Sequence, residues 1–183
     1  MVEGIVETMG LPVEGEDGWA GEADAEFEDL FRREFPGLAR TAFGIVGDWE
    51  VAKELAADGF VALLRHWSKV RSYDNPGAWL RRVVIRDALR SRRRSRRSAP
   101  VLVELEAGGS DADAVRAAVL QLPARQRAVV VLHYLDDLPV SEVAAVLGCS
   151  EGTVKTHLHR ARRALAGTLG EPIGEEEPDD VDR

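Results

Sequence analysis

A segment of twenty-nine residues, 138–166, constrains this chain more than any other feature, because it has the pattern of a helix-turn-helix. It reads LPVSEVAAVLGCSEGTVKTHLHRARRALA. Apolar residues at helical spacing predict a first helix over 140–147 and a second over 151–166, with Gly148 in the short turn that this motif requires. Ser150 is the predicted N-cap of the second helix, where its hydroxyl accepts backbone N–H bonds. The segment therefore predicts two helices that cross closely.

The predicted second helix of this motif has an apolar face and a cationic face. Its apolar residues recur at the helical period and should be buried; they are Val154, Leu158, Ala161 and Leu165. The opposite face suits a major groove, where bases offer acceptors and phosphates carry charge. Its candidate base contacts are Gly152, Thr156, His159 and Arg163, and its candidate phosphate contacts are Lys155, Arg160 and Arg162. The motif predicts DNA binding; a helical hairpin with a solvated basic face is the alternative.

A second cationic helix is predicted to begin at Asn75 and Pro76, which supply an N-cap and a first-turn proline. Nine arginines and one acid lie between positions 81 and 97. Because so many like charges on one helix repel one another unless a polyanion neutralises them, this helix also predicts contact with nucleic acid. Trp79 falls in the arginine sector, where its ring could stack on an unpaired base. The alternative is a tryptophan at the edge of the core.

Charge changes sign along the chain, so the net charge of −8 is an average over segments. The segment charges are −10 for residues 1–30, +9 for 31–98, −4 for 99–113, +3 for 114–170 and −6 for 171–183. Two basic blocks between acidic segments indicate a nucleic-acid partner.

An acidic start is the opposite of a secretory signal, and no apolar run is long enough to span a bilayer. We therefore expect a cytoplasmic protein without membrane insertion.

The fold class predicted from these patterns is all-α, with two small helical domains joined by a flexible linker. We expect a disordered acidic extension over 1–25, a helical domain over 26–98, an acidic linker over 99–113, a helix-turn-helix domain over 114–170 and a disordered acidic tail over 171–183. Cys149 is the only cysteine, which excludes an intrachain disulfide and a thiolate zinc site.

Local sequence patterns predict further structural features of the two domains. In the first, Pro36 is a predicted kink, Asp48 a predicted N-cap and residues 68–74 a predicted polar loop. In the second, apolar spacing predicts two short helices before the helix-turn-helix. Their apolar residues are Val115, Val119 and Leu122 in one, and Val129, Leu132 and Leu135 in the other.

Together, the two cationic segments and their order resemble the extracytoplasmic-function (ECF) sigma factors of bacterial RNA polymerase. Residues 48–94, which are similar to sigma region 2, read DWEVAKELAADGFVALLRHWSKVRSYDNPGAWLRRVVIRDALRSRRR. Residues 120–165, which are similar to sigma region 4, read LQLPARQRAVVVLHYLDDLPVSEVAAVLGCSEGTVKTHLHRARRAL. The resemblance covers about residues 27–169 and leaves only the two ends of the chain.

The resemblance implies that region 2 binds core RNA polymerase at the clamp of the largest subunit. The implied contacts are Glu54, Leu55, Asp58 and Phe60. Ala57 stands where the family usually has a glutamine, so one expected contact is missing. Without the resemblance, Glu54 and Asp58 would be interpreted as a solvated helix face. Region 4 is implied to contact the flap of the second-largest subunit, and an anti-sigma factor is a common partner in the family.

The resemblance also implies that each region contacts one promoter element. Region 2 would melt the minus-ten element and capture flipped bases through Tyr73, Asn75, Trp79, Arg82, Arg86, Arg90 and Arg93. Region 4 would bind the minus-thirty-five element as duplex through Ser150, Gly152, Thr153, Lys155, Thr156, His159, Arg160 and Arg163. The linker acids would enter the positively charged RNA path of the polymerase, or form a plain solvated linker; they are Glu104, Glu106, Asp111 and Asp113.

Two other functions fit parts of the sequence. A helix-turn-helix regulator would bind duplex DNA without core polymerase, usually as a dimer, but it leaves the arginine helix unexplained. A nucleic-acid-processing enzyme would need a catalytic constellation, and no His, Cys or carboxylate pair has metal-ligand spacing. We therefore predict a non-enzymatic initiation factor that needs neither a cofactor nor a metal.

Overall fold

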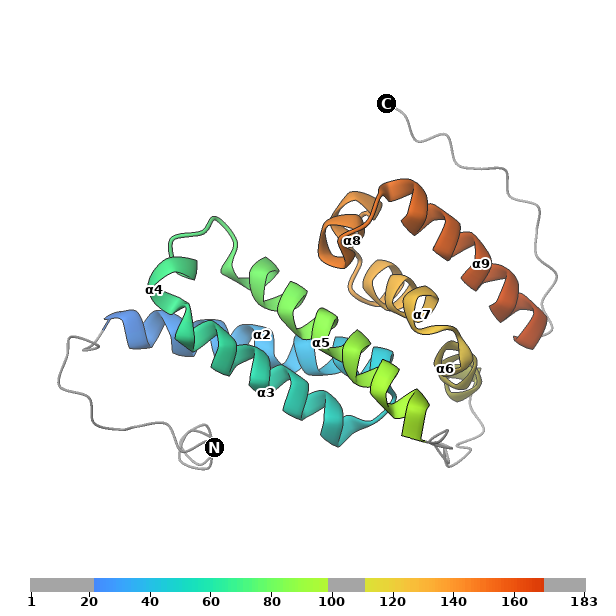
Figure 1. The fold of residues 1–183 in the computed structure, drawn as a ribbon, viewed down its shortest axis with the longest axis horizontal. Coiled ribbons are helices and arrows are strands. Elements are labelled where there is room, and N and C mark those ends of the chain that lie inside the picture. Colours follow the sequence, from blue (N-terminus) through green and yellow to red (C-terminus); the bar gives the residue numbers. More distant parts are fainter. Residues whose placement is uncertain (1–21, 99–110, 170–183) are drawn as a thin grey trace.

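The computed structural model describes residues 22–98 and 111–169, and nearly all of both stretches is helical (Figure 1). These two stretches contain no strand, and the predicted all-α class is confirmed. Most of the predicted extension, most of the predicted linker and the predicted acidic tail lie outside the described residues.

The first described stretch is a bundle in which three long helices pack against one another. Its helices are α2 (Glu22–Val46), α3 (Trp49–Arg65), α4 (Trp67–Val70) and α5 (Pro76–Ser98). Gly59 lets α3 approach α5 closely, because a Cβ there would lie 2.5 Å from Val84 Cγ2. Phe60 lies at the aromatic centre of the bundle, with its ring centroid 4.7 Å from that of Phe31.

One local prediction in this bundle is corrected and one is confirmed. α2 continues through Pro36 as the sequence predicted, and the kink at this proline stays a prediction. Part of the predicted polar loop over 68–74 belongs to α4, because Trp67 and Val70 are spaced one turn apart and are both buried. Asp48 caps α3 as predicted, with its Oδ1 accepting the Val51 backbone N–H at 3.0 Å.

The second described stretch contains the helix-turn-helix. Its helices are α6 (Asp111–Gln121), α7 (Ala124–Val130), the π-helical turn η1 (Val131–Leu135), α8 (Val140–Leu147) and α9 (Glu151–Leu169). α8 has the predicted bounds, and α9 extends three residues beyond its prediction. Gly148 ends α8 with a positive φ of 63°, a conformation that glycine adopts without strain.

Two residues predicted to lie in the core of this stretch are exposed. Leu135 retains 62% of its surface, because it is the last residue of η1, whose wider turn shifts the apolar period. The bond from Asp136 N to Val131 O at 3.1 Å, across five residues, marks this widening. Val115 retains 45% of its surface, because no other described element covers that side of the first turns of α6.

The two stretches share one hydrophobic core, and the sequence does not predict this packing. α2 contacts α6, α7 and η1, while α5 runs beside α7 and α8 (Figure 1). Gly44 permits the approach, since a Cβ there would lie 2.8 Å from a methyl carbon of Val131. Gly47, with a positive φ of 82°, lies against Leu120 in the same way. The arginine helix and the helix-turn-helix are therefore close neighbours in this structure.

Candidate nucleic-acid interface

α9 is held at its start by a side-chain cap and along one side by the core. Ser150 Oγ accepts the Thr153 backbone N–H at 3.2 Å and lies 2.9 Å from Thr153 Oγ1. The predicted cap is therefore present. Val154, Leu158 and Ala161 are buried as predicted, and Leu165 is half-buried.

The side of α9 opposite the core is open to solvent. All of the predicted contacts on this helix and its cap are exposed, namely Ser150, Gly152, Thr153, Lys155, Thr156, His159, Arg160, Arg162 and Arg163. Thr156 Oγ1 donates to the backbone oxygen of Gly152 at 2.8 Å, which leaves its lone pairs to accept a bond from a partner. The exposed face combines acceptors and cations, as the sequence predicted.

Glycine at position 152 is not required by the packing of the protein itself. A Cβ at Gly152 would meet only Ser150 Oγ, at 3.9 Å, which is an ordinary contact. Glycine in a helix is less stable than alanine by about 0.5–1 kcal/mol. The described residues would therefore accommodate alanine at position 152.

α5 presents its arginines along an exposed side. Arg82, Arg86 and Arg90 are exposed, whereas the side chain of Arg93 lies outside the described residues. One acid, Asp87, pairs with two of them, with its Oδ1 lying 3.3 Å from Arg90 Nη1 and 3.6 Å from Arg86 Nε. The side thus retains excess positive charge.

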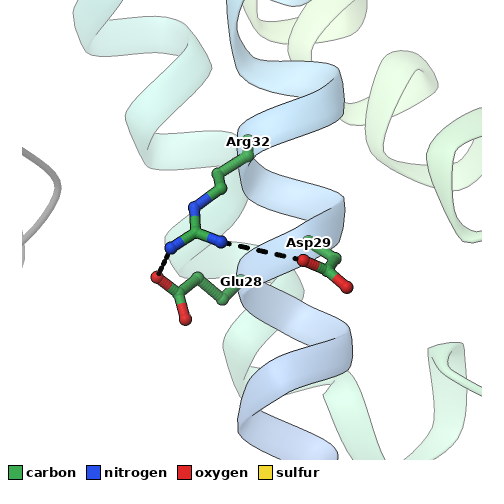
Figure 2. A network of polar contacts seen from close by, with 3 residues as sticks. All are labelled: Glu28, Asp29 and Arg32. Carbon is green, nitrogen blue, oxygen red and sulfur yellow. Dashed lines mark hydrogen bonds and ion pairs between the residues drawn. The ribbon is translucent and has the colours of Figure 1, made fainter.

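α2 provides a contrast, because one of its exposed arginines, Arg32, is neutralised locally. Figure 2 shows Arg32 between Glu28, with which it forms a short ion pair, and Asp29, whose Oδ1 lies 3.8 Å from Arg32 Nη1. Exposed pairs of this kind contribute about 0–1 kcal/mol to stability. Their effect here is on the surface potential around Arg32.

The predicted base-stacking residues at the start of α5 have distinct environments. Trp79 is half-buried against the core, and its ring centroid lies 5.9 Å from that of His66 in an edge-on arrangement. Tyr73 is exposed in the loop before α5. Asn75 caps this helix, with its Oδ1 accepting the Ala78 backbone N–H at 2.8 Å.

The predicted polymerase contacts on α3 divide into exposed and buried residues. Glu54 and Asp58 are exposed and one turn apart, and Leu55 is half-buried. Phe60 retains only 2% of its surface and packs in the aromatic core, so the prediction that it contacts a partner is wrong. The family resemblance alone implied a surface role, whereas its neighbours at helical spacing are core residues.

Sequence reasoning missed the polar residues that join the two stretches. Thr41 Oγ1 on α2 lies 2.9 Å and 2.8 Å from the two carboxylate oxygens of Asp136. Burial raises the pKa of Asp136 above its ordinary value, although the Thr41 hydrogen bond and the charges of Arg81 and Arg40 lower it. Neither residue belongs to a motif, so no sequence signal identified the pair.

Arg127 is the second polar link, and its side chain is fully buried. Its Nη1 donates to Ile45 O at 2.7 Å, and its Nη2 donates to Leu122 O at 3.2 Å and to Leu120 O. The three carbonyls lie at or just beyond the C-terminal ends of α2 and α6, where helices leave carbonyl groups without helical partners. One guanidinium thus ties both helix ends to α7.

No metal site or membrane span is found in the part of the chain that the structure describes. Its His, Cys, Asp and Glu residues form no group of three that could hold a metal ion. No helix within 22–98 and 111–169 is long and apolar enough to cross a bilayer.

Comparison with known proteins assigns both stretches to one family. The Sigma-70 region 2 family matches residues 30–98, and the Sigma-70 region 4 family matches residues 112–165. The chain is 32% identical over 151 residues to the ECF RNA polymerase sigma factor SigM of Mycobacterium tuberculosis, covering 79% of this chain and 77% of that protein. The chain belongs to the ECF sigma factor family. ECF sigma factors direct promoter-specific transcription with core RNA polymerase.

Further relatives agree with this assignment. The RNA polymerase sigma-E factor of Streptomyces coelicolor is 33% identical over 152 residues, covering 79% of this chain and 86% of that protein. The sigma factor RpoE of Bartonella quintana, solved with the anti-sigma factor NepR, has a TM-score of 0.61 and 25% identity and covers 79% of this chain and 97% of its own. CnrH, solved with the cytosolic domain of CnrY, has a TM-score of 0.60 and 25% identity and covers 80% of this chain and 89% of its own.

Proposed function

We propose that this ECF sigma factor divides promoter recognition between α5 and α9. α9 binds the minus-thirty-five element in the major groove of duplex DNA, and its reading face consists of Gly152, Thr156, His159 and Arg163. The loop and first turns of α5 hold the melted minus-ten element, with Tyr73 and Trp79 against flipped bases and the α5 arginines on phosphates. The observation that carries this proposal is the exposure of every predicted contact on α9 opposite a buried apolar stripe.

Region 2 docks on the polymerase clamp through the exposed part of α3. Glu54 and Asp58 lie one turn apart there and can meet cationic groups together. Region 4 meets the flap of the second-largest subunit through Tyr134 and Leu135, which retain 53% and 62% of their surface. Large apolar side chains exposed side by side are common at protein contacts.

The two regions separate when they bind a promoter. The centres of the two elements are about 25 base pairs apart, which is about 85 Å of duplex at 3.4 Å per base pair. α5 has 23 residues and is about 35 Å long. It packs on α8, which packs on α9, so two helix-packing distances of about 10 Å separate the two DNA-binding helices. The packed arrangement is too short to contact both elements.

An anti-sigma protein is a further partner, and the capture of RpoE and CnrH in complexes of this type supports it. The protein acts in the cytoplasm, where polymerase and chromosome are present, and contributes no catalysis of its own. The α9 face remains exposed while the regions are packed together, so a partner that stabilises this packing would block initiation without covering that face.

Run-off transcription with purified core RNA polymerase tests the function, using a promoter selected from a random DNA pool by the holoenzyme. The intact chain should make initiation promoter-specific. Trp79→Ala should lower the amount of open complex about tenfold, because stacking contributes about 1–3 kcal/mol per base. Permanganate reactivity of the minus-ten thymines measures opening, and electrophoretic mobility measures the closed complex, which should change little.

Two variants control this experiment. Trp79→Phe keeps an aromatic ring and should recover most of the opening, whereas a purely structural role would make both variants unstable. Trp49→Ala removes another partly exposed tryptophan, at the start of α3, and should open DNA normally. A chain that binds the selected duplex equally well without polymerase, and leaves start-site choice unchanged, would instead be a helix-turn-helix regulator.

Gly152→Ala is expected to stabilise the protein and weaken promoter binding. The added methyl group meets nothing closer than 3.9 Å in the protein and favours the helix by about 0.5–1 kcal/mol. On the reading face, however, the same methyl group would hold α9 away from the bases, and we expect about a tenfold loss of affinity. Thermal unfolding and fluorescence anisotropy with the selected promoter measure the two effects.

Gly167→Ala is the matched control, because Gly167 is also exposed on α9 and has open space around its Cα. It should raise stability by a similar amount and leave DNA affinity unchanged. Equal DNA affinity for both alanine variants would remove Gly152 from the reading face.

A further inference from the structure

The contact between Thr41 and Asp136 joins the two regions through a single hydroxyl group. Thr41 belongs to α2 and retains 2% of its surface, whereas Asp136 directly follows η1 and is half-buried. Thr41 Oγ1 lies 2.9 Å and 2.8 Å from the two carboxylate oxygens of Asp136, and 3.1 Å from the backbone oxygen of Gly37. Three oxygen atoms therefore surround a hydroxyl group that has one hydrogen to donate.

An ionised Asp136 leaves this contact incompletely hydrogen-bonded. A carboxylate only accepts hydrogen bonds, so Thr41 can donate to one of the three oxygens at a time. A neutral group at position 136 changes this, because a carboxylic acid O–H or an asparagine N–H can donate to a lone pair of Thr41 Oγ1. The Thr41 hydrogen is then free for Gly37. The contact is thus saturated only when residue 136 carries no charge.

The charge of Asp136 is not balanced by a close cation. Neither Lys nor Arg within 22–98 and 111–169 forms an ion pair with it. Arg81 of α5 and Arg40 of α2 lower its pKa and Asp137 raises it, but burial has the largest effect and the pKa lies above its ordinary value. Separation of the regions would remove much of this burial. Neutral Asp136 therefore favours the packed arrangement, and ionised Asp136 favours separation.

The other elements packed on η1 leave this balance to the groups already named. η1 contacts α7 and α8 in addition to α2. Of their ionisable side chains and that of η1 itself, three are bonded to backbone carbonyls elsewhere and one is exposed; they are Arg125, Arg127, His133 and Glu142 respectively. The state of Asp136 is therefore set by its burial, by Thr41 and by the charges on α2, α5 and Asp137.

We propose that Asp136 keeps the packing of the two regions releasable. Ionised, it holds α2 weakly through Thr41, so that the regions can separate on a promoter; neutralised, it stabilises the packed arrangement. This inference rests on the proposed function, in which the regions separate, and adds the residue that sets how readily they do so.

The labelling rate of a cysteine at the interface tests this proposal. Val131 retains 3% of its surface and lies against Gly44 of α2, so a thiol reagent should reach Val131→Cys when the regions separate. The variants are made in a Cys149→Ser background, which leaves one thiol. Asp136→Asn should slow labelling at neutral pH about two- to tenfold, the fold-change that corresponds to one net hydrogen bond.

The pH dependence of the same rate gives a second readout. The rates with Asp136 and with Asp136→Asn are compared from about pH 8 to about pH 5, a range in which carboxylates of ordinary pKa stay mostly ionised. Their ratio cancels the change in thiolate fraction, which affects both proteins equally. The ratio should fall as the pH falls, because Asp136 takes up a proton and the asparagine does not. A ratio that stays constant would contradict the role of the charge.

Two further variants separate this contact from a general effect of charge. Asp137→Asn removes the neighbouring exposed carboxylate, and asparagine tolerates the positive φ of 51° at that position, so labelling should not change. Thr41→Val removes the hydroxyl group and should reduce the effect of Asp136→Asn. The proposal is overturned if Asp136→Asn does not slow labelling, if Asp137→Asn slows it equally, or if Thr41→Val leaves the effect unchanged.

The labelling experiment contains neither DNA nor polymerase, and circular dichroism confirms that each variant is folded. Promoter-specific run-off transcription together with unchanged labelling would overturn the role of Asp136 and leave the proposed function standing. Slowed labelling by Asp136→Asn, without promoter-specific transcription by the parent chain, would overturn the proposed function and leave the contact between Thr41 and Asp136 as a property of the packed protein.

Discussion

A disulfide between positions 44 and 131 is expected to abolish promoter-directed transcription, and its reduction to restore it. A Cβ placed at Gly44 lies 3.6 Å from the Cβ of Val131, within the 3.5–4.5 Å that a disulfide requires. The same double substitution removes the Val131 methyl groups that a side chain at position 44 would otherwise meet. The bond can therefore form without moving α2 or η1.

The expected loss follows from geometry. The disulfide would hold α2 on η1 and thereby keep α5 beside α8. Two recognition surfaces about 20 Å apart cannot reach promoter elements that are about 85 Å apart. The cross-linked protein should keep its α9 face exposed and bind a minus-thirty-five duplex, yet support less than a tenth of the run-off transcription of the reduced protein.

The experiment uses Gly44→Cys and Val131→Cys together in a Cys149→Ser background, which leaves one possible intrachain bond. Transcription is measured before and after treatment with dithiothreitol, and non-reducing electrophoresis gives the cross-linked fraction. Each single substitution, treated with the same oxidant, controls for damage by oxidation. Full transcription by fully cross-linked protein would show that the packed arrangement is itself competent and that the regions need not separate.

The sequence predicted those parts of the fold whose causes are local. Asp48 and Ser150 cap helices because a short acceptor stands directly before an apolar helical run. Gly148 ends α8 because the turn needs a positive φ. The exposed side of α9 follows from the helical period, since the residues opposite Val154 and Leu158 have to face away from the core.

The parts that could not be predicted depend on long-range packing. The shared core between the regions arises where Gly44 meets Val131, and no periodicity links residues so far apart in the chain. Leu135 was placed in the core because the α-helical period was extended through a π-helical turn. Phe60 was assigned to a partner surface on the strength of the family resemblance, although its own spacing fits the core.

Arg127→Met is expected to destabilise the protein by about 3–5 kcal/mol, since it removes the donor to three carbonyl groups at the ends of two helices. Each buried acceptor without a donor costs about 1–3 kcal/mol. A methionine packs where the aliphatic part of Arg127 lies, but it donates no hydrogen bond and does not reach the three carbonyl groups. Arg127→Lys keeps the charge, but a single ammonium group cannot match the planar fork of the guanidinium, so an intermediate loss is expected.

Urea unfolding followed by circular dichroism measures this loss. Arg116→Ala is the control, because the exposed ion pair of Arg116 with Asp113 contributes at most about 1 kcal/mol.

Because Arg127 joins Ile45 of region 2 to α7 of region 4, its loss should also weaken the coupling between the two regions. The single cooperative transition expected of a shared core should then separate into two, with region 4 unfolding first since it retains fewer long helices. A change below about 1 kcal/mol with one transition would mean that water or other groups replace the guanidinium, and that the remaining contacts between the regions hold them together without Arg127.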